Sequence, residues 1–220
     1  MIKNSTFKFL EDVAVNNDRE WFQVNKSRYE DARANAIDFT REVILGLSVS
    51  DPLITTDIEP KDCVLRIYRD IRFSKDKTPY KTNIGIGISQ NGKNFKGPGY
   101  YIHIHPKTSF ITGGCWMPEA SLLKSIRQEI DYSSSDFNSI ISHPAFIKYY
   151  KNLDREDMLK TAPKGYGTDH PYINYLKLKS FTASHDINRK ILTGKDAVAY
   201  TVGVLRTLFP FMEFLRNAVS

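Results

Sequence analysis

Apolar residues in the first third of the chain recur every three or four positions, which is the spacing of an amphipathic helix. This pattern predicts a short helix over Thr6–Val15 and, after a polar break at residues 16–18, a long helix from Arg19 to Leu47. Asn17 precedes the second helix and, with Glu20 three residues later, resembles a capping box. We therefore expect a helical N-terminal third dominated by one long helix.

The hydrophobic period changes to two after residue 62, which is typical of strands. Because the connections between the apolar runs are short, neighbouring strands are expected to pair in an antiparallel meander, since parallel neighbours need longer crossovers. The predicted strands are Cys63–Phe73, Lys81–Gln90, Tyr100–His105 and Thr108–Trp116.

Helical spacing returns after Met117, with Pro or Ser at the expected helix starts. Phe181–Ile187 is the exception and predicts an added edge strand. Neither repeats nor low-complexity runs mark a boundary. We predict one α+β domain over residues 1–220, with an antiparallel meander of four or five strands covered by helices and a long N-terminal helix. The expected helices begin near Pro118, Ser135, Pro144, Pro171 and Asp196, and Pro210 breaks the last of them.

The composition is that of a globular protein large enough to need no disulfide or metal for stability. The chain has 220 residues, of which 41% are apolar and 25% charged. An uninterrupted apolar run of about 18 residues is missing, so we expect no membrane span. The N-terminus lacks a signal-peptide pattern and two cysteines are too few for a disulfide framework, so a cytoplasmic location is predicted.

Charge is distributed unevenly along the chain. Residues 1–60 contain 7 Lys and Arg against 11 Asp and Glu, whereas residues 61–116 contain 10 against 3. The middle third is therefore where an anionic partner is expected to bind.

Residues 66–81 carry six basic and two acidic side chains, and we call this segment the basic hairpin. In a regular strand, Leu65, Ile67 and Ile71 would share one face, and the opposite face would carry Arg66, Tyr68, Asp70 and Arg72. Guanidinium groups on that face are suited to a phosphate or carboxylate. We therefore predict an anion pocket there, with Asp70 or Tyr68 as the acid or base and with these ligand-binding candidates: Arg66, Arg69, Arg72, Asp76, Lys77, Tyr80, Lys81 and Lys164.

Arg69 does not fit this scheme, because strand alternation places it on the apolar face. A buried guanidinium needs a carboxylate or carbonyl partner, and Asp76 in the following turn is a candidate. The alternative interpretation is thus an Arg–Asp network that braces the hairpin and binds nothing.

The motif Arg66-Ile-Tyr-Arg-Asp-Ile-Arg-Phe73, followed by Asp76-Lys-Thr-Pro-Tyr-Lys81, resembles the signature of a widespread bacterial and fungal family of conserved proteins of unknown function. The resemblance extends to Arg19-Glu-Trp-Phe22 after Asn16-Asn17, to the segments around Tyr166 and His170, and to Phe214-Leu215. It implies a chain of about this length and fold, and it implies no reaction.

Other candidate sites are weaker. His103 and His105 share a strand face, but the sequence supplies no convincing third ligand, and His105 falls outside the family pattern, so we predict no metal site. The loop Pro163–Gly167 carries Lys164 and is short of a P-loop, which favours a plain turn. The sequence identifies no cofactor and does not decide whether the protein is an enzyme.

Three functional interpretations remain open. The first is a binder of, or enzyme for, a small anionic ligand, for example a phosphorylated one. The second is a nucleic-acid-binding module that uses the same positive segment, which the sequence pI of about 9.1 permits. The third is a structural or interaction protein. We favour the first, because the basic residues alternate with acids and lack the broad stripe that tracks a phosphate backbone.

Overall fold

The computed structural model describes residues 1–95 and 97–218, and the chain divides into two compact units. This division does not test the expectation of one domain, which stays a prediction. Unit 1 consists of Met1–Asn94, Tyr101–Ile111 and Asp186–Gly203, and unit 2 of Phe95–Tyr100, Thr112–His185 and Val204–Ser220.

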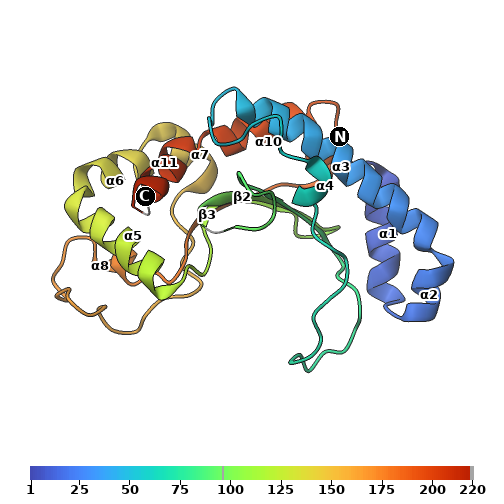
Figure 1. Cartoon of the computed structure of the whole chain (residues 1–220), viewed down its shortest axis with the longest axis horizontal. Coiled ribbons are helices and arrows are strands. Elements are labelled where there is room, and N and C mark those ends of the chain that lie inside the picture. Colours follow the sequence, from blue (N-terminus) through green and yellow to red (C-terminus); the bar gives the residue numbers. More distant parts are fainter. Residues whose placement is uncertain (96, 219–220) are drawn as a thin grey trace. The chain divides into compact units, whose positions relative to one another are not determined.

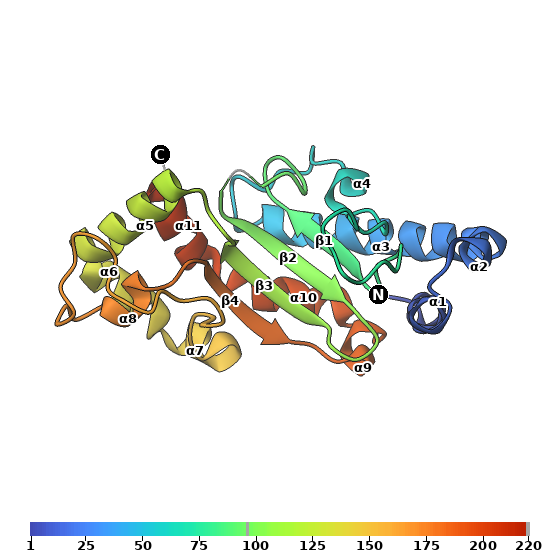
Figure 2. The ribbon, with the colours of Figure 1, turned by 90° about the horizontal axis from the view of Figure 1, so that it is seen from below.

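The predicted α+β fold is confirmed. The strands form one antiparallel sheet in the order β1-β2-β3-β4 (Figure 2). The apolar periodicity located three of them, because Ile84, Ile86 and Ile88 in β1 and Ile102 and Ile104 in β2 are all buried. The strands are β1 (Ile84–Ile88), β2 (Gly99–Ile104), β3 (Phe110–Cys115) and β4 (Phe181–Asp186).

One strand of the predicted meander does not form. Cys63–Phe73 is not a strand: Cys63 ends the short helix α4 (Pro60–Cys63), and only isolated bridges such as Tyr68 with Tyr80 follow. A continuous ladder is prevented because Pro79 has no N–H to donate and because the Lys77 ammonium takes the carbonyl of Ile71. The edge position at the far side of the sheet belongs to β4, which the sequence predicted as an added edge strand.

The helices of unit 1 include the long N-terminal one (Figure 1). The expected continuous helix from Arg19 is wrong at Asn25, where the chain leaves helical geometry and two helices meet. The Asn25 side chain donates to the Trp21 carbonyl and accepts from Arg28, and such local bonds compete with the helical backbone bonds. The helices are α1 (Asn4–Val15), α2 (Arg19–Val24), α3 (Lys26–Ser48) and α9 (Arg189–Leu192), in addition to α4.

Helices also make up most of unit 2, and their starts follow the Pro and Ser signals of the sequence. The segment expected to be helical from Pro171 to Lys179 is helical only in its middle. These helices are α5 (Ala120–Tyr132), α6 (Ser134–Ile141), α7 (Pro144–Tyr150), α8 (Ile173–Leu176) and α11 (Phe209–Asn217).

The C-terminal helices α10 (Ala197–Arg206) and α11 are separated at the predicted break, with Pro210 in the first turn of α11. Within residues 1–95 and 97–218, no single helix has both the length and the apolar character to cross a membrane. By length and composition alone, α10 and α11 reach that standard as a pair, bent by 43°. Several apolar side chains of this segment are fully buried, namely Leu205, Leu208, Phe211, Met212 and Leu215.

Gly114 in β3 is a point where unit 2 tolerates no side chain. Its φ is +131°, and a Cβ there would lie 2.0 Å from the Phe181 carbonyl oxygen of β4. We predict that Gly114→Ala lowers the free energy of unfolding by more than about 3 kcal/mol, because the β4 backbone must move. Gly165→Ala is the matched control: φ is +96° but the space is open, so about 1–2 kcal/mol is expected. Urea denaturation measures both, and equal costs would contradict the close-approach argument.

Candidate functional site

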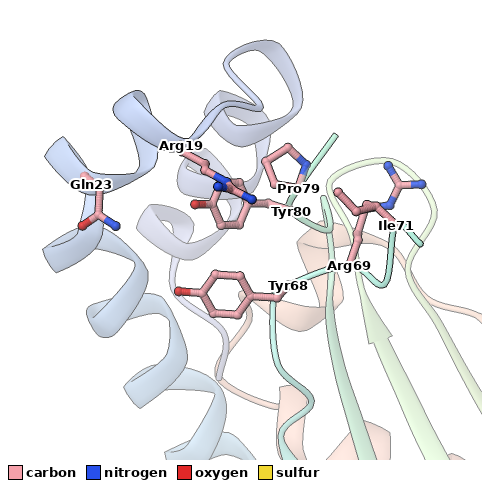
Figure 3. Close-up of a pocket in the computed structure, with 7 residues that line it drawn as sticks. All are labelled: Arg19, Gln23, Tyr68, Arg69, Ile71, Pro79 and Tyr80. Carbon is pink, nitrogen blue, oxygen red and sulfur yellow. The ribbon is translucent and has the colours of Figure 1, made fainter. Parts of the chain in front are cut away.

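A pocket of about 350 Å³ lies within unit 1, between α2 and the basic hairpin (Figure 3). Helix α2 contributes Arg19 and Gln23, which are four residues apart and therefore on one helix face. The hairpin contributes the rest of the lining: Tyr68, Arg69, Ile71, Pro79 and Tyr80.

Asn17 fixes the hairpin against the segment that leads into α2. Its amide donates to the Tyr80 carbonyl at 2.9 Å and accepts from the Tyr80 N–H at 3.0 Å, so one side chain satisfies both backbone groups of residue 80. Asp18 then caps helix α2, because its carboxylate accepts from the Trp21 N–H at 2.8 Å. These bonds set the position from which Arg19 faces the pocket.

The pocket floor is aromatic. The Tyr80 ring is 4% exposed and stacks on Phe22, with centroids 3.9 Å apart and an interplanar angle of 12°. Tyr68 lies 5.5 Å from Tyr80, centroid to centroid, and remains 48% exposed. In Figure 3 both tyrosine hydroxyls point toward the side occupied by α2. The site thus offers the hydroxyl groups of two tyrosines whose rings form an apolar floor.

Burial favours the neutral form of Tyr80. Burial raises the pKa of Tyr80, neighbouring Tyr68 raises it further, and Arg19 opposes the shift. Tyr80 is therefore a hydrogen-bond donor at neutral pH. Within residues 1–95 and 97–218, the Arg19 guanidinium forms no hydrogen bond or ion pair, so its charge is available to a ligand.

Arg69 braces the hairpin, as the alternative interpretation of the sequence expected. Its guanidinium is 2.5 Å from the Asp76 carboxylate and also donates to the Thr78 hydroxyl and, at 3.2 Å, to the Thr78 carbonyl. Asp76 in turn accepts from the Thr78 N–H at 2.9 Å. These bonds, led by the one from the Thr78 N–H, lower the pKa of Asp76 to about 2, so it stays ionised at neutral pH.

The expected opening of Arg66, Asp70 and Arg72 into the pocket is not seen, because none of the three lines it. Arg72 instead forms an exposed bidentate pair with Asp70, at 2.7 and 3.0 Å. This pairing lowers the pKa of Asp70 and leaves it a carboxylate, not a proton donor. Strand alternation fails because the segment is irregular: Ile67 is buried, whereas Ile71 is only partly covered and lines the pocket.

The lysine candidates lie elsewhere. Lys77 donates to the Ile71 carbonyl at 2.9 Å and Lys81 to the Arg66 carbonyl at 3.0 Å. Burial, with Arg66, lowers the pKa of Lys81. Lys164 belongs to unit 2 and is exposed on a turn closed by the Tyr166 N–H and the Pro163 carbonyl, which agrees with the plain turn that the sequence favoured.

Sequence reasoning missed Asn17, Arg19 and Gln23 as site residues. A signal existed for two of them, because Asn17 and Arg19 belong to a segment that carries the family resemblance, and the structure brings that segment against the hairpin signature. Gln23 could have been found only as the residue one helical turn after Arg19.

The histidine pair serves packing and a turn. His103 stacks on Phe110 at 4.7 Å and lies 3.1 Å from the Tyr101 hydroxyl, and burial, with His105, lowers its pKa to about 4. The His105 ring nitrogen accepts from the Thr108 N–H at 3.1 Å. In the described part of the chain, no three His, Cys, Asp or Glu side chains are grouped so that they could hold a metal ion.

Two further sequence features have structural explanations. Gly85 leaves room for a neighbouring side chain: a Cβ there would lie 2.7 Å from the Tyr101 hydroxyl. Cys63 and Cys115 are 0% and 2% exposed, and burial raises the pKa of each thiol to about 11. Neither thiol is a nucleophile at neutral pH.

The chain belongs to the family described as conserved hypothetical protein (DUF2461), whose pattern matches residues 5–214. This match confirms the resemblance found in the sequence, and it assigns no reaction. Neither a curated protein nor a solved structure matches the chain.

We predict that Asn17→Ala lowers the free energy of unfolding by about 1–3 kcal/mol, because both backbone groups of Tyr80 lose their partner. Asn16→Ala removes one bond, to the Asp12 carbonyl at the end of α1, and should cost about 1 kcal/mol or less. Urea denaturation of both variants measures the difference. A loss of unfolding free energy for Asn17→Ala no greater than that for Asn16→Ala would contradict the role of Asn17 in holding Tyr80.

We also predict that His103 makes a pH-dependent contribution to the free energy of unfolding. Its pKa of about 4 lies below the ordinary 6.5, so the unfolded chain binds the proton more readily. Stability from this group is therefore complete above about pH 6.5 and is lost as the pH falls through 4, by about 3 kcal/mol in total. Denaturation at pH 7 and pH 4.5 should show a smaller decline for His103→Gln than for the unmodified protein. A loss of stability in His103→Gln as large as that in the unmodified protein would contradict the assignment of this pH dependence to His103.

Proposed function

We propose that the pocket of unit 1 binds a small anionic ligand, with Arg19 as its cation. The observation that carries the proposal is the Arg19 guanidinium, which has no partner among the residues that the structure describes and lies beside a pocket that also presents the Tyr68 and Tyr80 hydroxyls. A charged group without an internal partner, next to hydrogen-bond donors above an apolar floor, is the arrangement typical of small-molecule sites.

The size and donors of the pocket limit the ligand. A volume of about 350 Å³ suits a molecule such as a sugar phosphate, a nucleoside monophosphate or a dicarboxylate. Arg19 is suited to hold a phosphate or carboxylate in a bidentate manner, and Gln23 lies on the same helix face to hydrogen-bond a neutral polar part. The exposed face of Tyr68 offers stacking or van der Waals contact to a planar or sugar ring.

Among the pocket residues, Tyr68 is the one placed for proton transfer. It is the pocket hydroxyl with access to solvent, whereas the ring of Tyr80 is buried. Asp70, the other acid–base candidate from the sequence, is engaged with Arg72 and does not line the pocket. The proposal is therefore first one of binding, with Tyr68 as the residue to test for chemistry.

We predict that a compact anion raises the melting temperature of the protein. At one hundred times the dissociation constant, the gain is about 2.7 kcal/mol, which corresponds to roughly 5–10 °C for a chain of this size. A thermal-shift screen of inorganic phosphate, sugar phosphates, nucleoside monophosphates and dicarboxylates measures it. Arg19→Gln should abolish the shift, because an amide cannot replace the guanidinium fork.

Arg41→Gln is the matched control for this experiment. It removes the same charge from the exposed surface of α3, where Arg41 pairs with Asp38 and does not line the pocket. The anion shift should persist in this variant and should weaken in Tyr68→Phe. Absence of a shift with every anion would overturn the proposal, as would a shift that survives Arg19→Gln or is lost in Arg72→Gln alone.

A further inference from the structure

The tip of the basic hairpin carries an aromatic ring that no other part of unit 1 covers. Phe73 is 95% exposed, although most phenylalanine rings are largely buried in folded proteins. The Arg72 guanidinium carbon lies 5.7 Å from the ring centroid, a cation–π distance. Figure 1 shows this part of the chain as a long loop that extends from α4 and β1. An aromatic side chain at such a tip is available for contact with a partner.

The ion pairs within the basic hairpin determine which of its charged side chains are available to a partner. Residues 66–81 contain six Lys and Arg and two Asp. Both aspartates are neutralised locally, Asp70 by Arg72 and Asp76 by Arg69. In the chain described by residues 1–95 and 97–218, the other four cations pair with no carboxylate, and they are Arg66, Lys75, Lys77 and Lys81. The alternation of bases with acids in the sequence is thus no obstacle to binding a polyanion.

We propose that the basic hairpin binds single-stranded nucleic acid, with a base stacked on Phe73 and backbone phosphates held by the neighbouring lysines. Stacking on exposed aromatic side chains together with unpaired cations is how proteins hold single strands without reading sequence. A duplex keeps its bases stacked on each other and offers no face to Phe73. The basic hairpin also lines the proposed pocket, but the residues proposed to hold the strand are different ones, because Phe73, Lys75 and Lys77 do not line it.

An anionic membrane surface is the other polyanion to consider. Lys75 and Lys77 would be attracted to it, but a lone Phe73 supplies little apolar area for insertion. Stacking needs one ring, whereas membrane anchoring needs more apolar surface than the hairpin presents. The single exposed ring therefore favours the nucleic acid.

Fluorescence polarisation with a labelled thymidine oligonucleotide of about 15 residues tests the proposal on the full chain. We expect binding that weakens with salt between about 50 and 200 mM. Phe73→Ala should reduce affinity roughly 5- to 100-fold, the effect of losing one stacked base. Lys75→Gln combined with Lys77→Gln should reduce the slope of log affinity against log salt by about 1.4, because each lost phosphate contact on a single strand contributes about 0.7.

The controls separate this inference from the pocket and from misfolding. Trp116→Ala removes another exposed aromatic ring, 73% exposed in unit 2, and should leave oligonucleotide affinity unchanged. Arg19→Gln should abolish the anion shift and keep oligonucleotide binding, so failure of one proposal does not imply failure of the other. Thermal melting verifies that each variant is folded.

Three results would overturn the inference. The first is no oligonucleotide binding by the unmodified protein at about 50 mM salt. The second is an affinity that Phe73→Ala, verified as folded, leaves unchanged. The third is Phe73-dependent binding to vesicles of phosphatidylserine and phosphatidylcholine without oligonucleotide binding, which would assign the hairpin to a membrane surface.

Discussion

The pair of hydrogen bonds between the Asn17 amide and the backbone of Tyr80 is the constraint on which the geometry of the pocket depends. The Pro79 carbonyl accepts from the Arg69 N–H, but Pro79 has no N–H to donate in return, so the pairing of Tyr68 with Tyr80 stays an isolated bridge. A side-chain amide, which has the donor and acceptor geometry of a peptide group, takes the place of the missing strand. Once Tyr80 is held, its ring stacks on Phe22, and α2 is fixed beside the hairpin.

The two carboxylates of the basic hairpin both form ion pairs within it. Asp76 and Asp70 are both committed to arginines within the hairpin, so they shape the turn and do not shield the surrounding cations from a ligand. Arg19 on α2 is left without a partner in the described chain. The distribution of free and paired charge, more than the total charge, thus distinguishes bracing residues from binding candidates.

Much of the fold follows from the sequence because it depends on local periodicity. The isoleucines of β1 and the apolar spacing of α1 predict those elements, and the prolines mark the helix starts of unit 2. The break at Asn25 and the irregular hairpin could not be found in this way, because side-chain bonds to the backbone, such as that of Lys77, decide them. In the site, the partner of Arg69 was predictable from the nearby turn. For Arg19 the family resemblance of its segment was the signal, and periodicity could not place it in the site because tertiary contacts bring it to the hairpin from a distant helix.

The buried cysteines have a practical consequence for work on this chain. With thiol pKa values of about 11, Cys63 and Cys115 are thiolate to only about one part in ten thousand at pH 7, and both are covered by the fold. A maleimide or a spin label would therefore bypass them. A single cysteine introduced by mutagenesis on the exposed surface would be the preferred site of reaction, so distance and mobility measurements could begin from the natural chain without first removing either thiol.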